Sequence, residues 1–517
     1  MGGIDRSCKH NDRCHDWGWR MRKGAGMYLL ATNRWNYARS WIGVASLLCS
    51  TLVSAQAPVS LAPQGWDRGL KLAEAVDRNP DPKIVEVDIT ARIADVEVAP
   101  GKRVYAWTYN GSIPGPLIRT HVGDRLIVHF TNGLPDPTTI HWHGMRAPIE
   151  MDGVPGISQP EMKRGDTFTY DFIVRDAGIY WYHPHVMSAA QVGFGLYGAV
   201  LVEDSTDGVG LADEVTLVLS DIAFNEQGEP DRPDSGGPAG MVFGREGDYL
   251  LVNGKQLPTL RARSGAPQRW RIVNAAKSRF FQLIMDGQPF YVIGGDGGLQ
   301  EYPVARDSLI ITAGERVDVI VTPKGPKGGI LTVHWMPFNR GYGSVEYRAV
   351  EKLLNIEFSN DPPLETVKLP DVRRKLDVPT TEGATMVDLV LSLPSKNSEG
   401  NSEFQVNGVP FWKAKPFPAK VGEKQIWVVK NDSQFDHPMH LHGFFFLALD
   451  EKLRPIHPLV WKDTLNVPQH STIRFLVLFD ERPGMWMFHC HILDHAEGGL
   501  MGHVHLEPVS SVEHAHP

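Results

Sequence analysis

The side chains best suited to redox chemistry lie in one short segment near the end of the chain. It reads His489-Cys490-His491 and is followed by His495. Because side chains alternate between the two faces of a strand, the flanking histidines would point to one side and Cys490 to the other. A cysteine thiolate with two histidines is the ligand set of a blue-copper electron-transfer site. The segment therefore predicts a thiolate-bound metal on one face and an imidazole-bound centre on the other.

Three further segments supply histidines with the same alternating spacing. They are His141-Trp142-His143-Gly144, His183-Pro184-His185 and His437-Pro438-Met439-His440-Leu441-His442. Two histidines separated by one residue lie roughly 6.5–7 Å apart on one face of a strand, which suits neighbouring metal ions better than a single chelate. Two more pairs, His503/His505 and His514/His516, are predicted to be surface-strand and tail residues.

In this order and spacing, the four segments resemble the copper motifs of the three-domain multicopper oxidases, a laccase-like family, here of bacterial type. The resemblance spans nearly the whole mature chain. It implies an all-β fold of three consecutive cupredoxin-like Greek-key β-sandwich domains. We expect an export signal region at 1–57, domains at 58–205, 211–360 and 380–510, and a Pro-rich linker at 361–379. The middle domain would hold no copper ligand.

The resemblance assigns the mononuclear, type 1 copper to His437, Cys490 and His495. The axial position of the family falls on Leu500, where bacterial members usually have Met, and Met501 would point away. An axial residue that does not bind copper should raise the potential of the site. In relatives, the ring edge of the residue matching His437 faces solvent and passes the substrate electron to copper.

The same resemblance implies four copper ions per chain and dioxygen as the electron acceptor, which is reduced to water with four electrons. His141 and His440 would bind the type 2 copper. Six histidines would share the type 3 pair: His143, His183, His185, His442, His489 and His491. Because the cluster ligands come from both ends of the chain, the first and third domains are expected to pack together, with the second as a spacer.

Carboxylates near these motifs are candidates for proton handling. Asp152, nine residues after His143, matches the family's acid that orients water at type 2 copper. Glu497 is a candidate proton donor towards the type 3 side, or else a solvated acid, because relatives place their carboxylate one residue earlier, where this chain has Ala496. Asp494 is a weaker candidate. Asp436 could accept a phenolic proton or be an ordinary exposed turn acid.

Length and composition agree with a soluble multidomain β protein. The chain has 517 residues, 51 Gly and 38 Pro, and turn residues punctuate its strand-like runs. The net charge of −8 offers no basic surface for nucleic acid. The oligomeric state is left open.

The N-terminal residues read as an export signal. Trp41 to Val53 is a short apolar run preceded by Arg34 and Arg39, and the following Ser-Ala-Gln-Ala predicts cleavage after Ala55. The run is too short for a convincing spanning helix, so no stable membrane insertion is expected, although an uncleaved anchor is an alternative. Translation could start at Met21 or Met27. The mature protein would be periplasmic or secreted and would keep one cysteine, Cys490, with no disulfide.

Three functions compete for this chain. The first is a laccase-type oxidase of phenols or aromatic amines. The second keeps the same copper machinery and oxidises cuprous or other low-valent metal ions; the scattered methionines favour the organic substrate. The third is a non-enzymatic copper-binding cupredoxin protein, which the complete set of eleven ligands disfavours. Structural zinc fits four HxH pairs and one cysteine poorly. The loops at 231–247 and 339–347 are candidates for shaping the substrate site.

Overall fold

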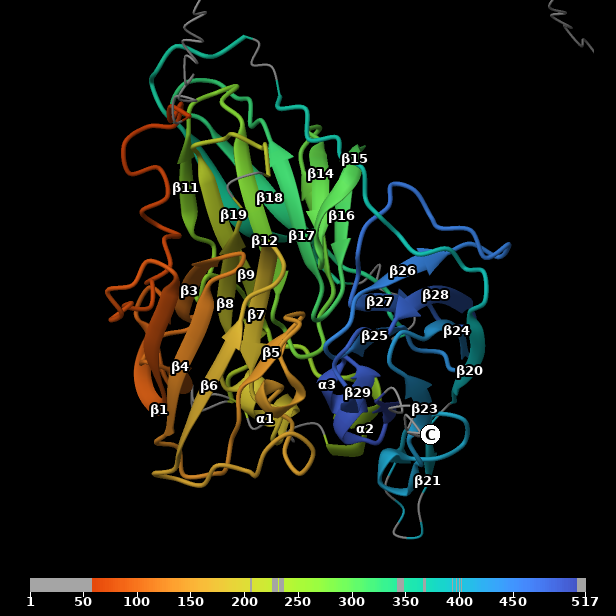
Figure 1. The fold of residues 1–517 in the computed structure, drawn as a ribbon. Coiled ribbons are helices and arrows are strands. Elements are labelled where there is room, and N and C mark those ends of the chain that lie inside the picture. The colour runs from red at the N-terminus through yellow and green to blue at the C-terminus, as the bar shows by residue number, and fades with distance from the viewer. Residues whose placement is uncertain are drawn as a thin grey trace, which may run out of the picture. The chain divides into compact units, whose positions relative to one another are not determined.

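The computed structural model of the protein describes residues 58–204, 207–225, 231, 237–341, 348–365, 369–392, 394–396, 398, 400 and 402–508. The predicted export segment, residues 232–236 and 342–347 of the two predicted substrate loops, and His514 and His516 lie outside these residues. The described part of the chain contains no helix with the length and apolar character needed to cross a membrane. Strands dominate it, and three pairs of sheets follow one another along the chain, which confirms the predicted all-β fold (Figure 1).

The first sandwich, residues 84–203, is built from two four-stranded sheets, ordered β2-β1-β4-β6 and β3-β8-β7-β5. Strand β4 illustrates the pattern: Leu126, Val128 and Phe130 are buried, and the residues between them are more exposed. Its elements are β1 Ile84–Ala99, β2 Lys102–Tyr109, β3 Gly115–His121, β4 Arg125–Asn132, β5 His141–His143, the 3-10 helix η1 Ile149–Met151, β6 Thr167–Ile173, β7 Gly178–His183, α1 Ser188–Gly193 and β8 Gly198–Glu203.

The second sandwich, residues 214–358, pairs a six-stranded sheet, β10-β9-β12-β17-β14-β15, with a five-stranded sheet, β11-β19-β18-β13-β16. Its elements are β9 Glu214–Ile222, α2 Gly237–Phe243, β10 Tyr249–Val252, β11 Thr259–Ala262, β12 Gln268–Asn274, β13 Phe281–Met285, β14 Phe290–Gly295, β15 Gly298–Arg306, β16 Ser308–Ile311, β17 Arg316–Val321, β18 Ile330–Met336 and β19 Glu351–Phe358. Helix α2 is not part of either sheet, and its position matters for the site below.

The third sandwich, residues 385–507, has a four-stranded sheet, β20-β24-β28-β26, a five-stranded sheet, β23-β30-β29-β25-β27, and a small β21-β22 hairpin. Its elements are β20 Thr385–Leu391, β21 Ser395–Lys396, β22 Ser402–Glu403, η2 Phe411–Lys413, β23 Phe417–Lys420, β24 Lys424–Asn431, β25 His437–Leu441, β26 Phe446–Leu449, β27 Thr464–Val467, β28 Thr472–Leu478, β29 Gly484–Cys490, α3 Leu493–Glu497 and β30 Met501–Glu507.

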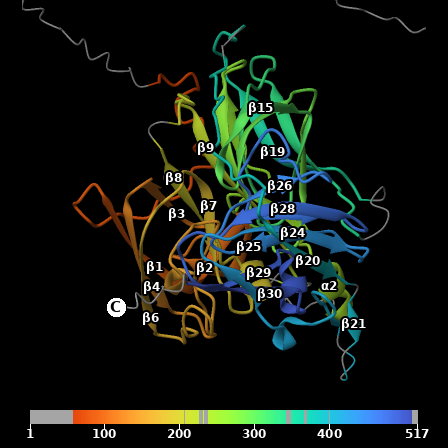
Figure 2. The ribbon, with the colours of Figure 1, turned by 45° about the vertical axis from the view of Figure 1, so that its right-hand side comes forward.

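The three sandwiches repeat one strand arrangement. A parallel pair recurs as β1 with β4, β9 with β12, and β20 with β24. A second parallel pair recurs as β3 with β8, β11 with β19, and β23 with β30. By this comparison β5 and β7 of the first sandwich correspond to β25 and β29 of the third. Figure 1 places β29 and α3 on the side of the third sandwich that is turned towards β7, and β29 lies near β7 in Figure 2 as well.

Candidate metal centre

The predicted ligands occupy corresponding strands of the first and third sandwiches. In the first, His141 lies opposite His183 on the antiparallel strands β5 and β7. In the third, His440 lies opposite His489 on β25 and β29. The remaining predicted ligands lie on these strands, just beyond their ends or on α3: His143, His185, His437, His442, Cys490, His491 and His495. Each sandwich thus offers a matching half of the cluster.

Three of the predicted ligands form a separate mononuclear group. Cys490 Sγ lies 3.5 Å from His437 Nδ1 and 3.8 Å from His495 Nδ1. The two Nδ1 atoms are 3.2 Å apart, and all three side chains are buried. Burial raises the pKa of the Cys490 thiol well above its usual value, so a bound cation would be needed to hold the thiolate.

The outer nitrogens of both mononuclear histidines are covered by protein. His437 Nε2 lies 2.8 Å from Ser433 Oγ, and His495 Nε2 donates to the Val242 carbonyl of α2 at 3.0 Å. The family resemblance led us to expect a solvent-facing His437, and that expectation is wrong, because its side chain is completely buried. The loop before His437 covers it through Ser433, and α2 of the second sandwich covers the neighbouring His495 through the Val242 carbonyl.

The residues flanking this group differ in burial and contacts. Leu500 is buried in the same core cluster as Cys490, whereas Met501 is partly exposed at the start of β30. The axial role of Leu500 stays a prediction. Asp436 is neither an exposed turn acid nor positioned towards solvent: it is buried and accepts hydrogen bonds from Asn466 Nδ2 at 2.7 Å and Gln469 N at 3.0 Å.

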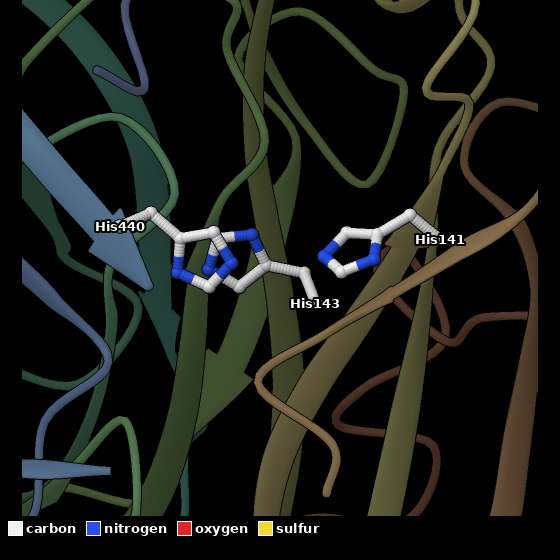
Figure 3. Close-up of side chains that lie close together, drawn as sticks. All are labelled: His141, His143 and His440. Atoms are coloured by element: carbon white, nitrogen blue, oxygen red, sulfur yellow. The ribbon is translucent and has the colours of Figure 1, made fainter. Parts of the chain in front are cut away.

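The other eight histidines gather into overlapping groups whose donor atoms lie within 4.8 Å of one another. His141, His143 and His440 form one group, in which the His143 and His440 rings stack at 3.7 Å while His141 faces them from the opposite side (Figure 3). The six predicted type 3 ligands divide into two triplets, His143/His183/His491 and His185/His442/His489. Each triplet takes ligands from both sandwiches.

Ring nitrogens left without partners test whether a metal fits here. Buried atoms with no hydrogen-bond partner include Nε2 of His141, His183, His185 and His440, Nδ1 of His143, and both nitrogens of His491. His442 Nε2 and His489 Nε2 face each other at 3.1 Å. Unpaired buried nitrogens are costly, and two facing imidazole acceptors need a shared proton or cation. The donor set therefore fits copper ions bound among these rings.

The opposite ring nitrogens are anchored, which fixes the tautomers. Nδ1 of His141, His183, His440 and His489 each donates to a backbone carbonyl, at 2.8–3.0 Å. Because a carbonyl only accepts, the other ring nitrogen keeps its lone pair for a metal. Burial also lowers the pKa of most of the cluster histidines, which keeps them neutral: His143, His183, His185, His440, His442, His489 and His491.

Asp152 joins the two halves of the cluster. Its Oδ2 accepts from His442 Nδ1 at 2.9 Å, and its backbone carbonyl accepts from His141 Nδ1 at 2.8 Å. Burial alone would raise the pKa of Asp152, but the two imidazoles outweigh burial and hold it well below its usual range. The predicted acid therefore lies against one predicted type 2 ligand and one predicted type 3 ligand.

Asp463 is a second such acid, and the sequence analysis missed it. Its carbonyl accepts from His440 Nδ1 at 3.0 Å, and its Oδ1 lies 3.3 Å from His143 Nε2. No motif marks it, since it lies 23 residues after His440 whereas Asp152 lies 11 after His141. Only the pairing of β25 with β27, which sets His440 opposite Thr464, would have placed it.

The two acids on α3 lie away from the histidine rings. Glu497 is exposed, its Oε1 accepts from Ala189 N of α1 at 2.8 Å, and partial loss of hydration raises its pKa. Asp494 is buried and accepts from Arg245 N at 3.0 Å and Ser278 Oγ at 3.1 Å. Asp494 therefore fastens α3 to the second sandwich, and the proton-donor role of Glu497 stays a prediction.

Histidines outside the motifs take no part in these groups. On β30, His503 is partly buried and His505 is exposed, as expected for a surface strand. His121 pairs with Asp124 at 3.2 Å and His129 with Glu86 at 2.9 Å, both towards the surface. His334 lies on β18 in the second sandwich. Among the described residues, every group of three or more potential ligands is drawn from the predicted eleven and Asp152.

The fold and the site define a copper-dependent oxidase, and comparison with known proteins agrees. Family models described as "Multicopper oxidase" match residues 91–207, 205–352 and 386–510, which together cover most of the chain. The chain belongs to the multicopper oxidase family. It is therefore an enzyme that oxidises a reducing substrate with dioxygen, as the sequence analysis predicted.

Individual relatives have different printed activities. The chain is 29% identical to multicopper oxidase MmcO of Mycobacterium tuberculosis, over 86% of this chain and 92% of that protein. It is 26% identical to a laccase of Bacillus subtilis, over 76% of this chain and 89% of that protein. The structure of a Campylobacter jejuni multicopper oxidase, described as a metallo-oxidase, superposes with a TM-score of 0.74 at 28% identity, covering 87% of this chain and 99% of that one.

Proposed function

We propose that the protein takes single electrons from small phenols or aromatic amines and uses four of them to reduce dioxygen to water. The observation that carries this proposal is the division of one strand end between two sites. Cys490 belongs to the mononuclear group, and its neighbours His489 and His491 belong to the two triplets of the cluster. With this arrangement, electrons collected at the mononuclear site would be used at the histidine cluster.

The proposal assigns four copper ions to each chain. His437, Cys490 and His495 would hold type 1 copper, with Leu500 in the axial position, and His141 with His440 would hold type 2. The two triplets would hold the type 3 pair. Copper supplies a reversible one-electron change of oxidation state that imidazole and thiolate ligands support and that the protein's own side chains lack.

The backbone between the two sites offers a short electron route. One branch is covalent, from Cys490 through the peptide to either histidine. A second branch is a hydrogen bond, because His489 Nδ1 donates to the Cys490 carbonyl at 3.0 Å. The route therefore reaches the triplet of His491 through covalent bonds alone. It reaches the triplet of His489 through covalent bonds and also through this hydrogen bond.

Asp152 and Glu497 are our candidates for proton handling. Asp152 holds two cluster histidines through its own oxygens, so it would keep a water beside the type 2 position oriented. Glu497 lies at the surface next to α1, which begins three residues after His185, so it would relay protons from solvent towards the type 3 side.

An aromatic path favours an aromatic reductant. Phe243, at the end of α2, is 39% exposed, and its ring lies 5.6 Å from the Phe435 ring. Phe435 in turn lies 5.9 Å from the His495 ring. A phenol or aromatic amine stacked at Phe243 would be separated from His495, a predicted type 1 ligand, by the two rings of Phe243 and Phe435, so it need not touch the buried His437.

Oxidation of cuprous or other low-valent metal ions is the second candidate. The burial of both type 1 histidines favours it, because a cover over the site restricts bulky substrates more than small ions. The Campylobacter relative is described as a metallo-oxidase. The complete ligand set and the family favour either oxidase over a non-catalytic copper-binding protein.

We further propose that the enzyme works outside the cytoplasm, in the periplasm or the medium. The support is the apolar run with its small-residue cleavage motif before residue 58. In the described residues Cys490 is a free thiol, which such a compartment tolerates because it is buried.

Oxygen uptake by the copper-loaded protein tests the reductant. A methoxyphenol and chelator-buffered Cu(I) are supplied in parallel, and the phenol is expected to give the faster uptake. Faster uptake with Cu(I) would reverse the order of the two candidates. No uptake with either, despite full copper loading, would overturn the proposed oxidase chemistry for both.

A pair of variants sharpens this experiment. Phe243→Ala should raise the KM for the phenol several-fold and leave Cu(I) oxidation unchanged. Tyr302→Ala is the matched control, because Tyr302 is an aromatic residue of the same sandwich with similar exposure, 37%. An unchanged phenol KM in Phe243→Ala would contradict the aromatic path.

A further inference from the structure

One turn of the second sandwich touches the histidine cluster, although that sandwich supplies no predicted ligand. Gly314 lies against the His491 ring, and a Cβ at this position would be 2.7 Å from the ring carbons. Its φ of +85° is also one that side chains rarely adopt. The turn is thus shaped to approach the cluster closely, and it leads directly to Arg316 at the start of β17.

Arg316 is completely buried and uses all of its donors. A guanidinium has five N–H groups. Here Nε donates to the Ile179 carbonyl of β7, Nη1 to the Gly314 carbonyl and Asp463 Oδ1, and Nη2 to the Asp296 carbonyl and Asp463 Oδ2. These partners come from all three sandwiches. A single side chain therefore fixes the first and third sandwiches to the second beside the cluster.

The fork of Arg316 ends on the acid that holds two cluster histidines. Asp463 accepts hydrogen bonds from both terminal nitrogens of the Arg316 guanidinium, with Nη1 at 2.7 Å. It also contacts His143 of the first sandwich and His440 of the third. Thr464 adds to the contact, since its Oγ1 donates to Asp463 Oδ1 at 2.8 Å and lies 3.2 Å from His143 Nε2. The position of Asp463 thus determines the orientation of a stacked His143/His440 pair.

Further charges brace the same arrangement. Asp296 accepts from Arg316 N at 2.8 Å, and Lys462 Nζ lies 3.1 Å from Asp296 and 2.5 Å from Glu315. The network has three carboxylates against two cations, so it presents excess negative charge beside a cluster predicted to hold cations. Because buried ion pairs contribute little net stability, their main effect here is to define geometry.

We propose that Arg316 is a positioning residue for the trinuclear centre. It holds Asp463, which orients His143 and His440 across the boundary between the first and third sandwiches. Retention of type 2 copper therefore depends on a residue of the sandwich that binds no metal. This inference rests on the copper assignment proposed above and adds to it a role for the second sandwich.

The test uses the copper-loaded full chain and the variant Arg316→Lys, which keeps the charge and loses the five-donor fork. After dialysis against a chelator, we expect the type 2 electron paramagnetic resonance signal per chain to fall at least two-fold. The blue type 1 absorption per chain should be unchanged, and it reports that the third sandwich is folded. Asp463→Asn should produce the same loss of type 2 signal, because the amide removes the charge and one of the two acceptors that Arg316 uses.

Arg269→Lys is the matched control. Arg269 is a buried arginine of the same sandwich, paired with Asp318 at 2.6 Å, and it does not contact a predicted ligand. A wild-type type 2 signal in Arg316→Lys would overturn the proposal, and so would an equal loss in Arg269→Lys. If Arg316→Lys does not fold, an intact signal in Asp463→Asn overturns it. Wild-type protein without type 1 or type 2 signals would instead overturn the copper assignment together with this inference.

Discussion

Asp152 and Asp463 hold the histidine cluster from opposite sides in the same way. Each accepts from a histidine of its own sandwich through its backbone carbonyl, Asp152 from His141 and Asp463 from His440. Each then reaches with its carboxylate to a histidine of the other sandwich, 2.9 Å to His442 Nδ1 and 3.3 Å to His143 Nε2 respectively. The cluster is thus an approximately two-fold arrangement that arises from two related sandwiches.

The two halves differ in which nitrogen remains for a metal. Asp152 contacts Nδ1 of His442, so Nε2 of that ring remains for a metal. Asp463 contacts Nε2 of His143, so Nδ1 of that ring remains instead. Among the described contacts, the arginine fork from the second sandwich holds Asp463 alone of the two acids. The second sandwich therefore breaks the symmetry of the centre.

Asp152→Asn should slow dioxygen reduction by about 10–100-fold, because outer partners of metal ligands have effects of this size. The amide keeps one oxygen acceptor but removes the charge beside His442 and His141. Stopped-flow measurements should find that the reductant still bleaches the blue colour at the wild-type rate while reoxidation by dioxygen is slowed. Asp124→Asn, at a buried acid of the same sandwich that contacts His121 and Lys83, should behave as wild type. Wild-type reoxidation in Asp152→Asn would contradict the role assigned to this acid.

Cys490→Ser should abolish both the blue colour and oxygen uptake and leave the fold intact. The serine is smaller than the buried cysteine and does not supply a soft thiolate. Circular dichroism should match wild type, and the type 2 signal should persist, because the eight cluster histidines are unchanged. Oxidation of the phenol at the wild-type rate would refute the electron route through this residue.

Glu246→Gln should lower stability in a pH-dependent way. The Glu246 side chain is 9% exposed and pairs with Arg279 at 3.2 Å, Arg340 at 3.0 Å and Arg348 at 2.9 Å. Burial opposes its ionisation, but the three arginines prevail and lower its pKa to about 2. A depressed carboxylate pKa stabilises the fold above the unfolded value of about 4.5, by about 3 kcal/mol, and this contribution is lost as the pH falls through 2.

Urea unfolding at pH 7 and pH 3 checks this prediction. The difference in unfolding free energy between wild type and Glu246→Gln should shrink by about 2 kcal/mol at the lower pH, since the wild-type carboxylate then loses most of its advantage. Glu357→Gln, at an exposed position on β19 of the same sandwich, serves as the control. A difference that stays constant or grows on acidification would show that the arginines do not act through the charge of Glu246.

The local part of the site could be predicted from the sequence, because alternation along a strand is a property of the strand itself. His489, Cys490 and His491 divide between two sites as that alternation requires. The separation of the six type 3 ligands into triplets could not be predicted, because it depends on how two sandwiches meet. The repeat of the sandwiches was also hidden, since it lies in backbone pairing such as β1 with β4 and β20 with β24.

The features that the sequence analysis missed have a similar cause. Arg316 lies 147 residues from Asp463 in the sequence, so no local pattern connects them. The closure of the mononuclear site was missed because its cover includes α2, whose Val242 carbonyl accepts from His495 although the two residues are 253 positions apart. Side chains that act across sandwich boundaries are defined by packing, which a single sequence does not display.

Leu500→Met should lower the type 1 potential. Leu500 is buried with Cys490 in one core cluster and offers no ligand atom, whereas a thioether at that position would stabilise oxidised copper. We expect a decrease on the order of 60 mV, which corresponds to a tenfold change in a one-electron equilibrium. Redox titration of the blue absorption measures the shift. Met501→Leu is the matched control: Met501 is partly exposed on β30, so its loss should leave the potential unchanged. A shift in the control and none in Leu500→Met would mean that the axial position belongs to residue 501 instead.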